Sequence, residues 1–176
     1  MAAQGGGFIK PEVLDSASAV LRDHYVSVRD TLRAVSGKVA ILQRDLRSAS
    51  DAVLLSRARG LHVACSAALR HLDRSRSGTL ESERGRRAPA PRRTAADRAF
   101  IELRAALAEC ITEYKAINRL DQASQVRERG TGIGIKTQLA IRNFEEAAEA
   151  YLLSLGIRVR PYGSGANPYA GSNRRN

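Results

Sequence analysis

The sequence is poor in aromatic residues and contains no tryptophan: aromatic side chains make up 5% of its 176 residues. Its core must therefore be built from leucine, valine, isoleucine and alanine, a composition that suits helices packed on helices. Cysteines are also scarce. Cys65 and Cys110 fall at apolar positions of helical patterns, and the sequence has neither a CxxC motif nor a Cys/His cluster. We therefore expect buried, reduced thiols and no metal site.

No run of apolar residues approaches the length of a membrane span, and Met1–Gly7 is glycine-rich rather than apolar. We therefore expect a soluble protein, located inside a cell or in a virion and not secreted by a signal peptide. The histidines His24, His62 and His71 are isolated from one another, and no nucleophile-elbow motif surrounds any serine. We accordingly predict no catalytic residues, no cofactor, no small-molecule substrate and no enzymatic activity.

What the chain has in excess is positive charge, with 29 Lys and Arg against 18 Asp and Glu and a net charge of +11. Only Lys10, Lys38, Lys115 and Lys136 are lysines, so the other 25 basic residues are arginines. A planar guanidinium binds phosphate or carboxylate through two hydrogen bonds and stacks on bases. The sequence therefore predicts an anionic partner, which could be nucleic acid, an acidic protein or an anionic membrane surface.

Apolar residues in the first half of the chain recur at alternating steps of four and three. This stripe consists of Leu21, Tyr25, Val28, Leu32, Val35, Val39, Leu42, Leu46 and Val53, and Ala49 occupies the position between Leu46 and Val53. Such heptad spacing is typical of a coiled-coil or bundle helix, and the stripe is the predicted seam between helices. Because Ser36-Gly37 could end a helix, residues 11–73 are predicted to form either one long rod or an antiparallel hairpin folded at Gly37. Beyond Val53 the apolar spacing shifts by one residue, to Leu54.

The remaining segments differ from this stripe in composition. Residues 1–10 are glycine-rich and are predicted to be a flexible N-terminal arm, and residues 74–94 are predicted to be an Arg/Pro/Gly-rich linker. Periodic apolar residues return over 95–156, where the glycines of 130–134 predict a break between the C-terminal helices of the bundle. Residues 157–176 hold four arginines and no acidic residue, which predicts a basic, extended tail.

The arginines of the linker and tail are the predicted polyanion-binding residues: Arg84, Arg86, Arg87, Arg92, Arg93, Arg158, Arg160, Arg174 and Arg175. They lie where the chain does not need to bury them. Cations that neutralise phosphates give affinity that depends on salt and little on sequence. A merely solvated linker is the alternative for the first segment, where Glu81 and Glu83 dilute the positive charge.

One resemblance supplements these patterns. The run Arg129-Gly130-Thr131-Gly132, followed by Arg142-Asn143-Phe144-Glu145, resembles the C-terminal region of the coat proteins of rod-shaped viruses, which are helical bundles. The spacing between the two runs is longer here and the rest of the chain does not align, so no residue roles are carried over.

The predicted fold class is all-α, a helical bundle with long heptad-patterned, coiled-coil-like helices, a basic flexible linker and a basic C-terminal tail. The predicted function is structural assembly, as a virion or phage-particle subunit (capsid, coat or tail). Such a subunit would self-associate through its helices and contact nucleic acid or acidic neighbours through its arginines. The alternatives are a cellular nucleic-acid-binding coiled-coil dimer with a chromatin-organising or regulatory role, and a protein-only assembly adaptor. We expect a homo-oligomer or a larger assembly, and whether the partner is RNA, DNA or acidic protein stays open.

Overall fold

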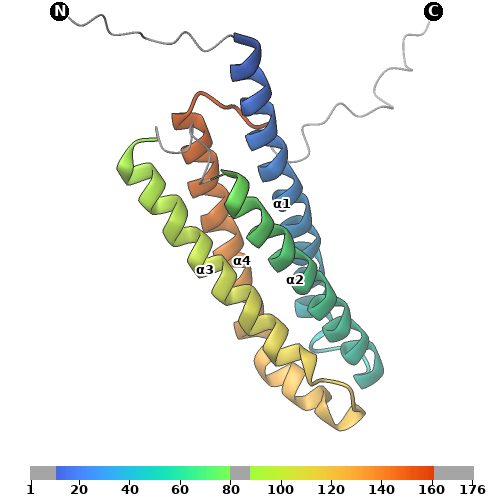
Figure 1. Cartoon of the computed structure of the whole chain (residues 1–176). Coiled ribbons are helices and arrows are strands. Elements are labelled where there is room, and N and C mark those ends of the chain that lie inside the picture. Colours follow the sequence, from blue (N-terminus) through green and yellow to red (C-terminus); the bar gives the residue numbers. More distant parts are fainter. Residues whose placement is uncertain (1–10, 80–87, 161–176) are drawn as a thin grey trace, which may run out of the picture.

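The computed structural model describes residues 11–79 and 88–160 of the chain. The helices are α1 (Pro11–Asp45), α2 (Asp51–Thr79), α3 (Ala90–Lys115) and α4 (Ala123–Ser154), with the short 3-10 helix η2 (Leu120–Gln122) before α4. Consecutive helices run antiparallel and pack side by side as a four-helix bundle (Figure 1). The all-helical prediction is confirmed, and the two described segments contain no strand.

The core runs along the bundle axis. All predicted seam residues from Leu21 to Leu46 are at most 6% exposed, and they lie where α1 packs against α2 and α4 of the same chain. In α2 the buried stripe continues in the shifted register, from Leu54 to Leu72. The apolar faces of the helices are therefore satisfied within one chain, with the aliphatic side chains that the composition indicated.

The chain reverses direction at residues 46–50, so the predictions of a turn at Gly37 and of a single rod are both wrong. Gly37 lies inside α1, and a Cβ atom there would meet nothing within 4 Å. Instead the Ser50 Oγ accepts a 3.4 Å hydrogen bond from the Val53 N–H, and Asp51 occupies the first turn of α2. Val53 does not continue the seam, because it is 38% exposed and Leu54 takes the core position.

The predicted break at the glycines of 130–134 is also wrong, because this segment lies inside the uninterrupted helix α4. A Cβ on Gly130 would lie 2.9 Å from Leu46 Cδ2, and one on Gly134 would lie 3.1 Å from Val39 Cγ1. These two glycines therefore let the backbone of α4 approach α1 closely, and the packing gained there outweighs the poor helix propensity of glycine.

The helices extend into the predicted linker from both sides. Helix α2 continues to Thr79 and α3 begins at Ala90, so the prediction of a linker over 74–94 is wrong at both of its ends. Residues 80–87, the arm 1–10 and the tail residues 161–176 lie outside the described residues. Within the described segments, no helix is long and apolar enough to cross a membrane.

Candidate polyanion and assembly surfaces

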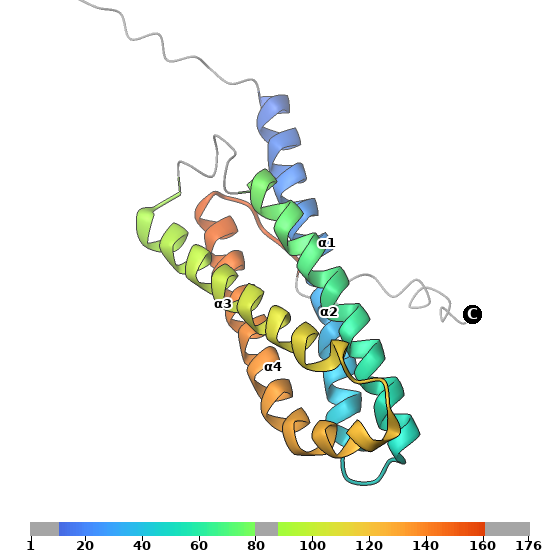
Figure 2. The same ribbon diagram turned by 60° about the horizontal axis from the view of Figure 1, so that its bottom comes forward.

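Both arginine-rich segments start from the same end of the bundle. Because the helices alternate in direction, Thr79 at the end of α2, Ala90 at the start of α3 and Ser154 at the end of α4 lie together, and this end is called the arm end (Figures 1 and 2). The turn at 46–50 and η2 lie at the opposite, far end. Of the predicted polyanion-binding residues, Arg84, Arg86, Arg87, Arg174 and Arg175 lie outside the described residues; the other four lie at or near the arm end.

Two of these arginines occupy the first turn of α3. Pro89 is the N-cap residue and Pro91 is the second residue of the helix. The fixed φ of proline suits the first turn, and no side chain caps the helix. Arg92 is exposed and Arg93 is half-buried, and the first turn contains no acidic residue. The positive end of the helix dipole thus coincides with two cations, which is unfavourable unless an anion lies nearby.

The other two arginines follow α4 on a short segment that packs on the bundle. The chain leaves the helix at Gly156, whose φ of 77° is readily adopted only by glycine. Ile157 is 4% exposed and Val159 packs on the core, whereas the side chains of Arg158 and Arg160 are exposed. The start of the predicted tail is therefore fixed, and its alternating side chains direct the two arginines to solvent.

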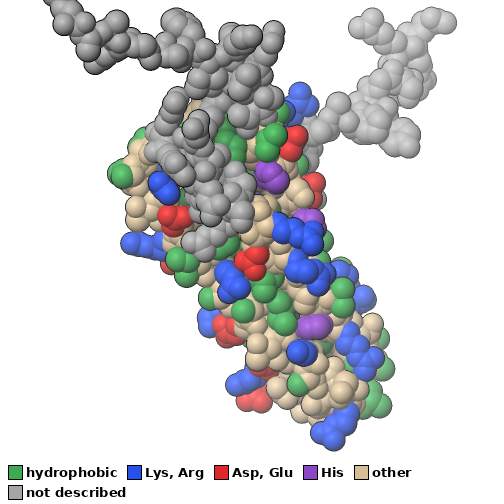
Figure 3. Space-filling model, in the orientation of Figure 1, with side chains coloured by type: hydrophobic (Ala, Val, Ile, Leu, Met, Phe, Trp, Pro, Cys, Tyr) green, Lys and Arg blue, Asp and Glu red, His purple; other side chains and the backbone are tan. Residues whose placement is uncertain are grey.

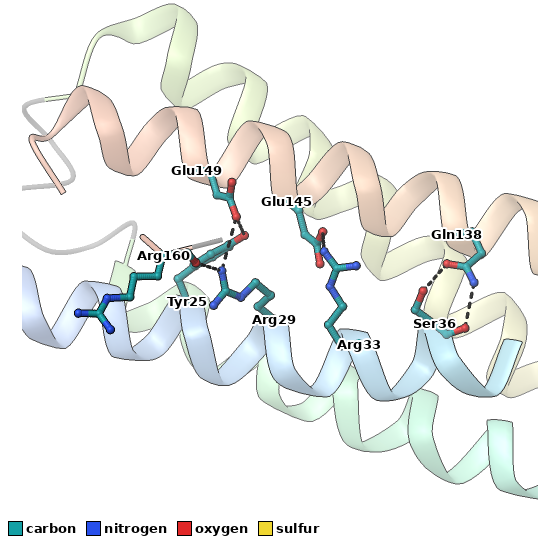
Figure 4. Close-up of polar contacts among 8 residues, drawn as sticks. All are labelled: Tyr25, Arg29, Arg33, Ser36, Gln138, Glu145, Glu149 and Arg160. Atoms are coloured by element: carbon teal, nitrogen blue, oxygen red, sulfur yellow. Dashed lines mark hydrogen bonds and ion pairs between the residues drawn. The ribbon is translucent and has the colours of Figure 1, made fainter. Parts of the chain in front are cut away.

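A row of polar contacts between α1 and α4 anchors this segment (Figure 4). Arg29 is only 6% exposed, and its Nη1 donates a 2.6 Å hydrogen bond to the carbonyl oxygen of Arg160. Its guanidinium also lies 5.7 Å from the centroid of the Tyr25 ring and 3.8 Å from Glu149 Oε1. The Tyr25 hydroxyl donates to the same carboxylate oxygen at 2.8 Å. Arg29 is thus a positioning residue for the segment that carries Arg158 and Arg160.

The row continues toward the middle of the bundle. Arg33 Nη2 lies 2.7 Å from Glu145 Oε2, and next to this ion pair Ser36 and Gln138 exchange two hydrogen bonds, of 2.5 and 3.0 Å. Burial raises the pKa of the Glu145 carboxyl above its ordinary value, although Arg33 opposes that shift. The sequence analysis missed this row because it considered only the arginines of the linker and tail. The signal that could have found it is the position of Arg29 directly after Val28, a residue of the predicted seam.

The predicted seam is not a free surface. Its residues from Leu21 to Leu46 are buried within the chain, so a partner helix could reach them only if the bundle opened. Among the side chains that the structure describes, the large apolar ones that remain exposed are Val20, Val53, Val63, Ile101, Leu120, Ile135, Leu139 and Leu153. Candidate contacts between subunits are therefore on the outer faces of the helices.

The two cysteines lie in the core. Cys65 and Cys110 are free and buried, with their sulfurs 3.2 Å apart between α2 and α3. Hydrogen bonding to Cys65 and burial both raise the pKa of the Cys110 thiol, which lowers its reactivity. No group of three or more metal-ligating side chains occurs within the described residues. An apolar pocket with a volume of about 60 Å³ is lined by residues such as Phe100 and Phe144.

Comparisons with protein-family models, with curated protein sequences and with solved structures find no match to this chain.

Proposed function

We propose that the chain is a structural subunit of a virus or phage particle, or of a comparable filament, which self-associates through the outer faces of its bundle and contacts nucleic acid through its arginines. The observation that carries this proposal is that the described ends of both arginine-rich segments, which hold Arg92, Arg93, Arg158 and Arg160, lie at or near the arm end. A subunit built in this way has exposed arginines at the arm end and leaves the flanks of the bundle for neighbouring copies. It acts by packing and charge neutralisation and needs no chemical turnover.

The burial of the heptad stripe favours this proposal over a coiled-coil dimer. A dimer joined through Leu32 and Val35 would need these side chains at its surface, but both are 0% exposed within the chain. Association that leaves the bundle intact must use side chains such as Val63 and Ile135, which are 64% and 59% exposed. These lie on different helices, as expected of a subunit that contacts more than one neighbour.

The polyanion part is tested by removing cations from one end at a time. Replacing Arg158 and Arg160 by Gln keeps the backbone carbonyl that Arg29 binds and removes two exposed charges near the arm end. Replacing Arg47 and Lys115 by Gln, both exposed near the far end, removes the same charge and serves as the control. Affinity is measured against single-stranded RNA and DNA oligonucleotides over a salt series.

We expect the arm-end variant to weaken binding and to reduce the slope of log affinity against log salt by up to about 2, roughly 1 for each lost phosphate contact. Adding Arg174→Gln and Arg175→Gln should reduce the slope further. The control should retain nearly the parental slope. Equal losses in the two variants would show that binding is spread over the whole surface and would refute a polyanion site at the arm end.

A further inference from the structure

The outer face of α2 is cationic around an exposed apolar centre. Between Asp51 and Asp73 the helix has no acidic residue and three arginines, Arg57, Arg59 and Arg70, and basic side chains line this side of the molecule (Figure 3). Arg59 and Arg70 are exposed and lie on one side of the helix with Val63 between them. Neither has an ion-pair partner among the described residues, and Arg59 Nη2 donates a 3.0 Å hydrogen bond to the carbonyl oxygen of Asn118, which leaves its charge unpaired. Since an α-helix rises 1.5 Å per residue, the two arginines are roughly 16 Å apart along the axis. These three residues are called the α2 face.

The outer face of α4 has the converse pattern. Ile135 and Leu139 are 59% and 49% exposed one turn apart, and they border a groove of about 530 Å³ whose other wall belongs to α1. Glu128 and Glu146 lie two turns beyond this apolar pair on either side, roughly 27 Å apart along the axis. Both carboxylates are exposed and have no ion-pair partner among the described residues; Arg142 is the one cation between them on this stripe. Glu128, Ile135, Leu139 and Glu146 are called the α4 face.

The two faces are complementary in chemistry. Each has an apolar centre, and the outermost charges are positive on α2 and negative on α4, where Arg142 lies between Leu139 and Glu146. Long arginine side chains span the difference between the two charge spacings, so an α2 face laid along an α4 face can pair charges on both sides of the apolar contact. Burying the apolar centres supplies affinity, and the flanking charges fix the register.

The faces also lie on opposite sides of the molecule. Helix α2 packs next to α1 and α3, and α4 likewise packs next to α1 and α3, so α2 and α4 occupy diagonal corners of the bundle (Figures 1 and 2). When two copies bind through the α2 face of one and the α4 face of the other, the pair still has one free α4 face and one free α2 face. Such a contact repeats and builds a row or ring of subunits rather than a closed dimer.

We propose that the α2 face of one copy docks on the α4 face of the next, with the helices side by side. This inference rests on the proposed assembly function and names the two surfaces that carry it. Nucleic acid would find the arginines of α2 attractive too, but an exposed valine between them and a matching acidic, apolar face on the same molecule favour a second copy.

The test uses two variants, each with one face blocked. Val63→Glu with Arg70→Glu reverses the α2 face, and Ile135→Lys with Leu139→Lys charges the α4 face; all four side chains are exposed, so the bundle should fold. Ile101→Lys, 58% exposed on α3 and outside both faces, is the control. Circular dichroism checks the fold, and sedimentation over a protein concentration series, without nucleic acid, measures assembly.

We expect the control to assemble like the parental chain, and each blocked variant alone to need at least a tenfold higher concentration. Mixed one to one, at a salt concentration that screens the attraction between the introduced Glu and Lys side chains, the blocked variants should form a heterodimer that grows no further, because each still has one intact face. Dimers of the α2-blocked variant alone would indicate an α4–α4 contact and overturn the proposal. The proposal would also be overturned if either blocked variant assembled like the parental chain. This includes the outcome in which the α2-blocked variant loses affinity for nucleic acid but assembles normally. If the parental chain itself stays monomeric, the proposed function fails together with the inference.

Discussion

The glycines of α4 allow a sharp test of how this helix packs on α1. Gly130 and Gly134 face α1, whereas a Cβ on Gly132 would meet nothing within 4 Å. Replacing each in turn by alanine adds the same methyl group to the same helix. The gain in helix propensity is about 0.8–1 kcal/mol at every position, so any difference between the three variants reports the space facing α1.

The distances give the expected order. At Gly132 the full gain should appear as a rise in Tm of about 2–4 °C for a chain of this size. At Gly130 the new methyl would lie 2.9 Å from Leu46 Cδ2, and Leu46 is only 6% exposed, so the core must shift at a cost of about 1–3 kcal/mol. The net change should be a loss of about 0–2 kcal/mol. At Gly134 the nearest atom, 2.6 Å away, is the flexible amide nitrogen of Gln43, so that variant should fall between the other two.

Urea denaturation followed by circular dichroism, at a concentration where the chain is monomeric, measures the three free energies of unfolding on one scale. The expected order of stability is Gly132→Ala, then Gly134→Ala, then Gly130→Ala. If Gly130→Ala gains as much stability as Gly132→Ala, α4 does not contact α1 through its glycines and this part of the packing is refuted.

Three further predictions follow from burial and charge. Leu32→Asp should cost more than about 3 kcal/mol or unfold the bundle, because Leu32 is 0% exposed. Ala34→Asp, on the exposed side of the same helix, should cost less than about 1 kcal/mol, mostly through helix propensity, and comparable urea midpoints for the two variants would contradict the buried stripe. Arg29→Gln removes the guanidinium that donates to the Arg160 carbonyl, so amide hydrogen exchange at residues 157–160 should accelerate. Unchanged exchange rates would show that Arg29 does not hold this segment in place. Burial raises the pKa of Glu145, so the folded chain holds that proton more tightly than the unfolded chain. Stability relative to Glu145→Gln should therefore be fully present below the ordinary glutamate pKa and decline as the pH rises through the folded-state pKa; parallel pH profiles would contradict this sign.

The helical content and the buried stripe could be predicted because they depend on local spacing. From Leu21 to Leu46 the alternation of four and three residues matches the helix period, and every one of these positions is buried. The turn at 46–50 could not be located in this way, since Leu46, Ala49 and Val53 keep the same spacing across it. The local signal was an N-cap serine followed by an aspartate, a weak pattern beside a long heptad run.

The glycines of α4 and the buried Arg29 show what a local reading misses. Glycine in a helix costs stability by itself, so a cluster of three indicates a break unless a partner surface requires the missing Cβ. That surface belongs to Val39, Gln43 and Leu46, far away in the sequence. Similarly, Arg29 is distinguished from exposed arginines only by the carbonyl and the carboxylate that α4 and its following segment bring to it.

The central claim, that this chain is a subunit of a larger nucleic-acid-containing assembly, is tested most directly by sedimentation velocity of the purified protein with and without single-stranded nucleic acid over a salt series. We predict species of many subunits whose size grows with protein concentration and which incorporate nucleic acid at low salt and release it at high salt. A monomer at every concentration, with or without nucleic acid, would contradict the claim, and a dimer that grows no further would point instead to a regulatory nucleic-acid-binding protein.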